Sequence, residues 1–181
     1  MFVGLQFKLE LRKEDKEKLI KIMHKQSSAI RVAYNMLKEL EKEKTKSLHA
    51  QIYQRLRQLF PELPTKYIDS AIYKAKQYPT DRPVVFGGRR LFEKLCKNHL
   101  TGKAREKLKN QCKELRQGTL ISIGSKADKG NRLMRFEDLN GQLCLRITTG
   151  NREFIYAKEK FMEVCPLNFQ RLKLDTQKRT E

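Results

Sequence analysis

Four glycines with basic neighbours are the residues of this chain whose types and spacing first suggest chemistry. The Gly87-Gly88 pair directly precedes two arginines, and two more glycines lie in the basic segment from Gly124 to Arg135. Glycine lets the backbone turn sharply or approach a ligand closely, and cations beside such turns are suited to phosphate groups. The pattern predicts contacts with nucleic-acid phosphates, made by Arg89, Arg90, Lys126, Lys129, Arg132 and Arg135.

The overall charge also favours a polyanionic partner. The 181 residues include 40 Lys and Arg against 21 Asp and Glu, which gives a net charge of +19. The excess is spread out, with +8 over residues 1–80 and +11 over residues 81–181. Such a surplus favours nucleic acid over an acidic protein or a membrane surface, and a merely solubilising surface is the alternative.

The densest charge lies between Arg89 and Arg116, where ten basic residues stand against three acidic ones. The pattern predicts two short helices here, interrupted at His99-Leu-Thr-Gly102. A helical hairpin with a balance of +7 favours phosphate contact over a solvated face. Lys94 and Lys97 therefore join the candidate phosphate-binding residues.

Three helices are predicted before this segment. Apolar residues at steps of three or four predict helices over residues 13–44, 47–60 and 63–78, with Thr65 as a cap of the third. Outward faces that mix aromatic, amide and cationic groups can stack on bases and reach their edges. The alternatives are a solvated face and, for the tyrosines, core packing. The candidate DNA-binding residues are Arg31, Asn35, Tyr67, Ser70, Tyr73 and Lys74.

Strands are predicted where the pattern has a period of two. Residues 2–11 alternate apolar and polar side chains, and further strands are expected at 84–86, 119–124, 132–137, 142–148, 153–158 and 169–174. The pairs Asn140-Gly141 and Gly150-Asn151 are strong hairpin signals. We therefore predict an α+β fold, in which a small OB-like β-barrel is interrupted by a helical lobe and residues 2–11 pair with the later strands.

The expected domain boundaries follow from this order. Residues 1–12 and 79–175 would form the barrel lobe, with the basic helical hairpin at 89–116. Residues 13–78 would form the helical lobe, and residues 176–181 a flexible tail.

Other classes of protein are disfavoured. No apolar run approaches the ~20 residues of a transmembrane helix and no secretory signal is evident, so we expect a cytoplasmic protein. The four cysteines form no Cys-x-x-Cys pair, and no phosphate-binding Gly-x-x-x-x-Gly-Lys-Ser/Thr loop is present, so neither a metal site nor a cofactor is expected. No nucleophile motif accompanies any of the three histidines, which makes an enzyme the least favoured class.

Two motifs carry a family resemblance. Val84-Val-Phe-Gly-Gly-Arg-Arg-Leu-Phe92, the basic hairpin that follows and Gly124-Ser-Lys-Ala-Asp-Lys-Gly-Asn-Arg-Leu-Met-Arg-Phe136 resemble the N-terminal half of TnpB-like proteins. These are transposon-encoded RNA-guided nucleases related to type V CRISPR effectors. The resemblance covers nearly the whole chain and is specific mainly in the two motifs. It implies a wedge β-barrel interrupted by a recognition lobe, which together hold a structured guide RNA and meet target DNA.

The resemblance also suggests roles for single residues. Arg89, Arg90, Lys126, Lys129, Asn131 and Arg132 resemble guide-RNA and heteroduplex contacts by position, and the helix with Tyr67, Ser70, Tyr73 and Lys74 resembles the element that faces the DNA motif. With the charged residues identified above, the expected RNA-binding set is Arg89, Arg90, Lys94, Lys97, Lys126, Lys129, Asn131, Arg132 and Arg135.

The nuclease half of that family has no counterpart in the sequence. Its carboxylate trio holds two metal ions, whereas Asp128, Glu137, Asp138, Glu153 and Asp175 are scattered and form no recognisable set. We therefore expect that this chain does not cut DNA by itself, and that a separate RuvC-like chain is a possible partner. The alternative function is a stand-alone DNA-binding regulator, with one of the first three helices in a major groove.

Overall fold

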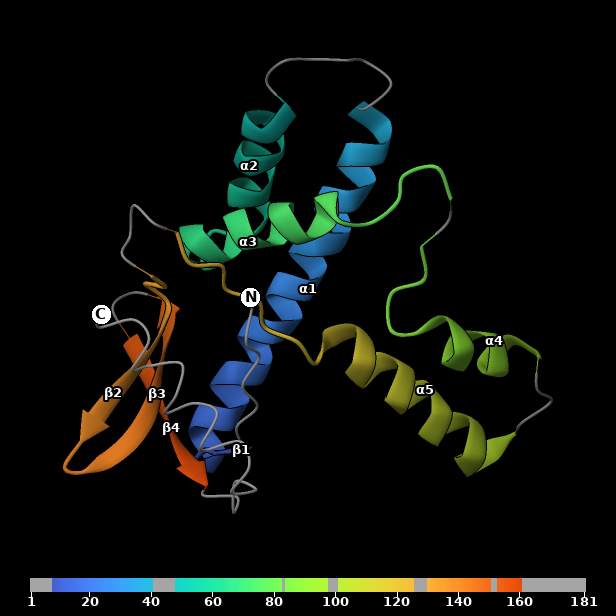
Figure 1. Ribbon diagram of the computed structural model, residues 1–181. Coiled ribbons are helices and arrows are strands. Elements are labelled where there is room, and N and C mark those ends of the chain that lie inside the picture. Colours follow the sequence, from blue (N-terminus) through green and yellow to red (C-terminus); the bar gives the residue numbers. More distant parts are fainter. Residues whose placement is uncertain are drawn as a thin grey trace, which may run out of the picture.

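The computed structural model describes residues 8–40, 48–82, 84–97, 101–125, 130–150 and 153–160. In chain order these form β1 (Lys8–Glu10), α1 (Lys13–Leu40), α2 (Leu48–Leu59), α3 (Thr65–Lys76), α4 (Arg89–Lys97), α5 (Gly102–Gln117), β2 (Met134–Leu139), β3 (Gln142–Gly150) and β4 (Glu153–Lys160). Figure 1 shows α1 between the sheet and the α4–α5 pair, with α2 and α3 at its C-terminal half. The fold is α+β, as predicted.

The core lies where α1, α2 and α3 meet. Ala29 and Ala33 of α1 and Ala71 and Ala75 of α3 are fully buried, because their small side chains let the two helix backbones approach closely. Larger apolar side chains fill the space around them, and each contributes roughly 1.5–3 kcal/mol when fully buried. These include Ile30, Tyr34, Leu37, Ile52, Leu56, Leu63, Ile68 and Ile72.

One residue of α1 anchors the segment that leads to the basic hairpin. The hydroxyl of Tyr34 donates to the carbonyl oxygens of Pro79 and Arg82, at 2.9 and 3.3 Å. Its ring meets those of Tyr78 and Phe86 edge-on, with centroid separations of 6.1 and 5.6 Å. The predicted strand at 84–86 is wrong: these residues pack against the helical core without pairing to a strand.

The sheet has the order β1-β4-β3-β2, and all neighbours are antiparallel. Asn140 and Gly141 form the turn between β2 and β3, with φ of 56° and 79°, as their hairpin signal predicted. Leu9 pairs with Glu159, so the expected pairing of the N-terminal strand with late strands is confirmed for Lys8–Glu10. The described strands form an open sheet with β1 and β2 at its edges, whereas the sequence predicted a small barrel, closed or partly closed.

The segment from Thr119 to Ser125 is held by side chains, and the strand expected at 119–124 is not formed. Gln26, fully buried on α1, takes the place of a neighbouring strand: its Nε2 donates to Ile121 O at 2.6 Å, and Ile121 N donates to its Oε1 at 2.7 Å. Ile123 N donates to the hydroxyl of Ser70 at 3.2 Å. Side chains of α1 and α3 therefore supply the hydrogen-bond partners that a neighbouring strand would otherwise provide.

The element boundaries otherwise follow the predictions closely. The first helix was expected to reach Lys44, but α1 ends at Leu40 and residues 41–47 lie outside the described part. Thr65 was expected to cap the third helix, yet it is the first residue of α3, and Pro64 precedes it without a side-chain cap. The strand expected at 169–174 and the tail at 176–181 also lie outside the described residues.

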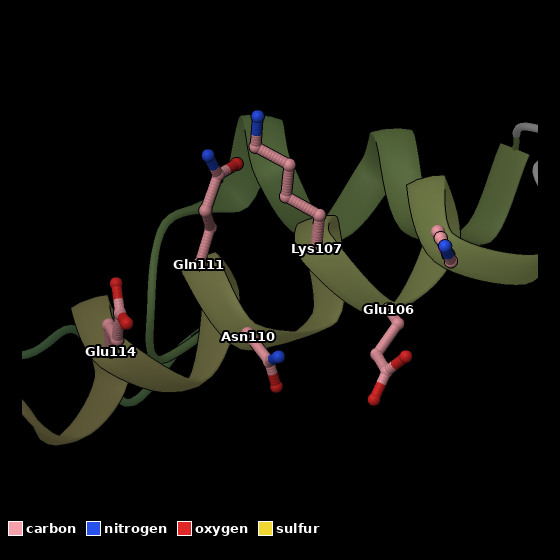
Figure 2. A pocket seen from close by; sticks show the side chains of 6 residues that line it. Glu106, Lys107, Asn110, Gln111 and Glu114 are labelled. Atoms are coloured by element: carbon pink, nitrogen blue, oxygen red, sulfur yellow. The ribbon is translucent and has the colours of Figure 1, made fainter.

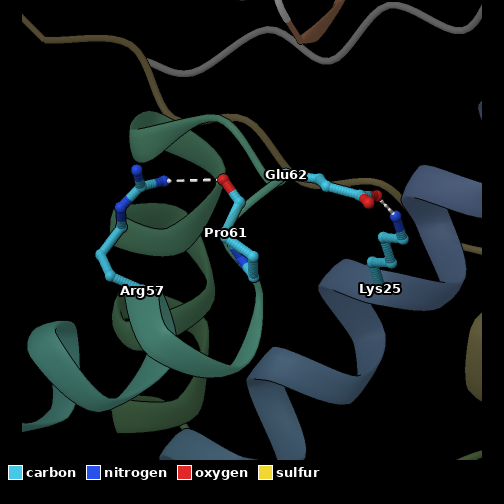
Figure 3. A network of polar contacts seen from close by, with 4 residues as sticks. All are labelled: Lys25, Arg57, Pro61 and Glu62. Atoms are coloured by element: carbon cyan, nitrogen blue, oxygen red, sulfur yellow. Dashed lines mark hydrogen bonds and ion pairs between the residues drawn. The ribbon is translucent and has the colours of Figure 1, made fainter.

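A polar network at the turn before α3 connects two of the core helices. The ammonium group of Lys25 on α1 forms a hydrogen-bonded ion pair with Glu62, and Arg57 of α2 donates to Pro61 O at 3.5 Å (Figure 3). Arg57 also donates to Leu63 O at 3.0 Å. These contacts hold the α2–α3 turn beside α1. No helix in the described ranges combines the length and the apolar character that a membrane span requires.

Candidate nucleic-acid interface

The basic hairpin, α4 with α5, is the most exposed part of the described chain. Neither helix contains a buried residue, and all ten of its basic side chains are exposed. Arg89, whose side chain is 81% exposed, pairs with Glu93 one turn further along α4 at 2.9 Å. The cations thus face solvent over the length of both helices, where phosphates can reach them.

Two faces of α5 differ in charge. Arg105, Lys109, Lys113 and Arg116 recur at steps of four, four and three residues, which places them in one row along the helix. The opposite face surrounds a shallow depression of about 440 Å³ and mixes both charges with amides. Figure 2 shows Lys107 and Gln111 on one side of this face and Glu106 and Asn110 on the other. The row of four cations is the face of α5 best suited to a phosphate backbone.

The row ends where α5 meets α1. Arg31 of α1 donates from Nη2 to the hydroxyl of Ser28 at 2.9 Å, while its Nη1 is buried without a hydrogen-bond partner. Burial lowers the pKa of Arg31, and the positive charge of Arg116 lowers it further. Two guanidinium groups therefore repel each other at this junction, and a nearby anion would relieve that repulsion.

The residues of α3 that were predicted to contact DNA do not all lie on one exposed face. Tyr67 and Ser70 were expected to face outward, but they are 0% and 3% exposed. The hydroxyl of Tyr67 donates to Thr148 O at 3.0 Å, and that of Ser70 donates to Lys66 O at 2.8 Å. Their outward orientation is a wrong prediction, because helix and sheet pack over that side of α3.

The remaining candidates on α1 and α3 reach the surface. Tyr73 is 55% exposed and Asn35 is exposed. Lys74 is half-buried; its ammonium group donates to the Gln77 side chain at 3.0 Å and lies 5.5 Å from the centre of the Tyr78 ring. The expected DNA face is therefore reduced to a few separate side chains.

The second glycine-containing motif is only partly described. Lys126 and Lys129 lie outside the described residues, and Ser125 and Gly130 are joined to each other by two backbone hydrogen bonds of 3.0 and 3.1 Å. The Asn131 amide is occupied within the chain, since Oδ1 accepts from Leu133 N at 3.0 Å and Nδ2 donates to Ser122 O at 3.2 Å. This amide stabilises the local loop. Arg132 and Arg135 are exposed nearby.

The sheet offers a second exposed surface with aromatic rings. Phe154 and Tyr156, two residues apart on β4, are 43% and 39% exposed. The guanidinium of Arg146 lies 4.6 Å from the centre of the Phe154 ring and pairs with Glu137 at 3.0 Å. Such rings, flanked by a cation, have faces on which bases can stack. Among the described residues, no group of three or more His, Cys, Asp or Glu side chains is placed to hold a metal ion.

One comparison with known proteins identifies the family. The family described as SSO2105 N-terminal domain matches residues 2–179, which is nearly the whole chain. The chain belongs to this family. No curated protein and no solved structure shows significant similarity to it.

Sequence reasoning named Arg31 as a candidate DNA contact, but it missed Arg116 and the junction of α1 and α5 that brings the two together. The steps of four and three that place Arg105 to Arg116 in one row are visible in the sequence, and they distinguish this face from the rest of the charge run. The approach of Arg116 to Arg31 carries no local signal, because 84 residues separate them and tertiary packing alone brings them together.

Proposed function

We propose that the chain is a nucleic-acid-binding module that resembles the guide-RNA and target-DNA binding half of a TnpB-like RNA-guided nuclease and acts in the cytoplasm. The observation that carries the proposal is the basic hairpin, which presents ten exposed cations and contains no buried residue. A segment with this composition contributes little to the core, so binding a polyanion is the role that best explains it.

The division of labour follows from the surfaces. The candidate RNA contacts are the exposed cations of α4 and the exposed arginines beside β2. The row of four cations on α5, from Arg105 to Arg116, is added to these RNA contacts, because it extends the positive surface of the hairpin. The candidate DNA contacts are the exposed side chains on α1 and α3, now without Tyr67 and Ser70. In RNA-guided systems the protein holds backbone shape while base pairing reads the target, and this suits a basic surface with few base-reading groups.

Two further points are consistent with this proposal. The matched family is described as an N-terminal domain, and the binding half of TnpB-like proteins is also N-terminal. The open sheet has β1 and β2 as edges, and a wedge-like barrel would close if the chain outside the described residues joined them. Strand cleavage would then belong to a separate RuvC-like chain.

The stand-alone DNA-binding regulator is less well supported. A recognition helix must present its side chains to a major groove, but six of the twelve residues of α3 are buried. Binding of a short DNA duplex without RNA, at the affinity measured for structured RNA, would favour this second function.

The first test measures salt dependence. Replacing Arg89, Arg90, Lys94 and Lys97 with Ala should weaken binding of a structured RNA and flatten the slope of log affinity against log salt, because each lost phosphate contact removes counterion release. Fluorescence anisotropy between roughly 50 and 200 mM salt spans the range in which such slopes are measured.

A matched variant provides the control. Arg12, Lys13, Lys16 and Lys21 are exposed on the first part of α1 and around its start, so their replacement by Ala changes the net charge equally. The hairpin variant should lose more slope than this control. Equal slopes in both variants, or in the hairpin variant and the wild type, would show that the hairpin is merely solvated.

Two further experiments test the RNA and the lack of cleavage. Sequencing of the nucleic acid that co-purifies with the chain identifies the RNA. A mixture of the chain, Mg²⁺ and that RNA should leave target DNA intact.

A further inference from the structure

A pocket of about 270 Å³ lies where the basic hairpin joins the helical core. It is formed by α1, α3, the segment from Val85 to Gly88 and the end of α5. Its volume is close to the lower end of the range of small-ligand pockets, ~300 Å³, so it suits one small group and excludes a double helix. The junction pocket is therefore distinct from the open surfaces of the hairpin.

The charge of the junction pocket is positive. Lys74 and Arg116 line it, Arg31 is close enough to Arg116 for their charges to interact, and no Asp or Glu is among the lining residues. In the described part of the chain, none of these three cations forms an ion pair with a carboxylate. Lys74 has only the neutral Gln77 amide as its hydrogen-bond partner.

Arg31 does not line the pocket, but it adds positive charge beside Arg116. Its Nη1 is buried and has no hydrogen-bond partner, although buried polar groups in proteins are nearly always paired. The charge of Arg116 acts on Arg31, so an anion held by Arg116 in the pocket would offset the repulsion between the two guanidinium groups. Planar guanidinium groups are well suited to phosphate.

The glycine pair and the rings complete the pocket. Gly87 and Gly88 both have positive φ, of 96° and 93°, and α4 begins directly after them, so the positive end of its dipole lies beside the pocket. The rings of Tyr78 and Phe86 also line the pocket, with their centroids 5.2 Å apart. An aromatic wall next to a cationic one matches a base joined to a phosphate.

We propose that the junction pocket binds one nucleotide of a single-stranded nucleic acid, with its phosphate on Lys74 and Arg116 and its base against Tyr78 and Phe86. That the nucleotide belongs to a nucleic-acid strand rests on the proposed function, whereas binding of a single nucleotide to the pocket does not depend on it. The phosphate is either the 5′-terminal group of the strand or an internal diester at a sharp turn of the backbone.

The test uses three small probes that separate the contributions of phosphate and base. Adenosine 5′-monophosphate should bind the full chain, while adenosine and inorganic phosphate, which each lack one half, should bind more weakly. Lys74→Gln combined with Arg116→Gln should weaken binding of adenosine 5′-monophosphate about tenfold or more, because two charge-assisted hydrogen-bonding groups are lost. Isothermal titration calorimetry measures the affinities, and circular dichroism checks that each variant is folded.

The control removes two charges at a distance. Lys16→Gln combined with Lys21→Gln should leave affinity for adenosine 5′-monophosphate unchanged, since both side chains are exposed on the first half of α1. Absence of binding to the wild type, or equal weakening in the two double variants, would overturn the proposal. If the first double variant fails to fold, Lys74→Gln replaces it, with the same expected direction.

Two hexanucleotides then identify the source of the phosphate. Tighter binding of the 5′-phosphorylated strand than of the 5′-hydroxyl strand, lost in the variant, indicates a terminal phosphate. Equal binding of both strands, weakened in the variant, indicates an internal one. Failure of the proposed function can be distinguished from failure of this inference. If the hairpin variant keeps the salt slope of the wild type while adenosine 5′-monophosphate still binds, the pocket binds a nucleotide but the proposed RNA-binding role of the hairpin is wrong.

Discussion

Two helices of comparable length, α3 in the helical core and α5 in the basic hairpin, differ in how many residues they bury. Half of the twelve residues of α3 are buried, whereas the sixteen residues of α5 include none. Both sequences place apolar residues at helical spacing. The difference arises because α3 has neighbours on several sides, while α4 and α1 are the only described helices or strands that α5 contacts. A helical pattern in the sequence therefore predicts that a helix forms, but it does not predict how much of the helix surface is buried in the fold.

The comparison predicts where stability resides. Tyr67→Ala should destabilise the chain by about 3–5 kcal/mol, because it removes a large, fully buried ring and leaves a cavity. Leu115→Ala on α5, where the side chain is 59% exposed, should cost no more than about 0.5 kcal/mol. Urea unfolding followed by circular dichroism measures both. A cost for Leu115→Ala similar to that for Tyr67→Ala would show that the hairpin belongs to the core.

A smaller and more local effect is expected where the two regions join. At Gly87, φ is 96°, and an added Cβ would lie 2.6 Å from Cys112 O and 2.9 Å from Arg116 Cβ. Gly87→Ala should therefore detach α5 from the core at a cost on the order of 1–3 kcal/mol, seen as faster hydrogen exchange in α4 and α5 with the core amides unchanged.

Gly102→Ala is the control for this change. Gly102 also has positive φ, of 60°, but nothing lies within 4 Å of an added Cβ, so only the backbone strain remains. Its expected cost is about 1 kcal/mol. Faster exchange throughout the core in the Gly87 variant would contradict the separation of the two regions.

The smallest effect concerns the ion pair at the α2–α3 turn. The hydrogen bond from Lys25 lowers the pKa of Glu62 below its ordinary value, and the charge of Lys25 lowers it further. Because the folded pKa is the lower one, the pair stabilises the fold above the unfolded pKa, and this contribution is lost as the pH falls through the folded pKa. Both groups are exposed, so the effect is small and screened by salt.

The measurement compares melting temperatures across pH. Glu62→Gln should melt slightly below the wild type at neutral pH, and the two should converge in acid. Glu39→Gln, an exposed change near the end of α1, controls for the loss of negative charge alone. A difference that stays constant down to low pH would show that Glu62 acts through packing and not through its charge.

The sequence predicted most of the elements because their signals are local. The helical spacing from Lys13 onward, the break near Gly102 and the Asn140-Gly141 turn each report on neighbours along the chain. The pairing of Lys8–Glu10 with β4 was also predicted, from the need of serial hairpins for an edge partner.

The errors share a different cause. The strand expected at 119–124 failed because Gln26, which lies 95 residues from Ile121, supplies its hydrogen bonds. Tyr67 and Ser70 have the residue types of a binding face, but they are covered by elements distant in sequence. The Arg31–Arg116 pair escaped notice for the same reason. Each of these three features depends on tertiary packing, which a periodic pattern along the chain does not report.

The Gln26 contact has a mechanical consequence. Its bonds to Ile121 close a span of 95 residues that includes α2 to α5, a closure whose entropic cost is roughly 4 kcal/mol. On the C-terminal side of the hairpin, only the few residues between the end of α5 and Ile121 can absorb a tilt, since the chain beyond them is bonded to α1 before it enters β2. A tilt of α4 and α5 would therefore reach the chain no further than Gln26, and the sheet would keep its register.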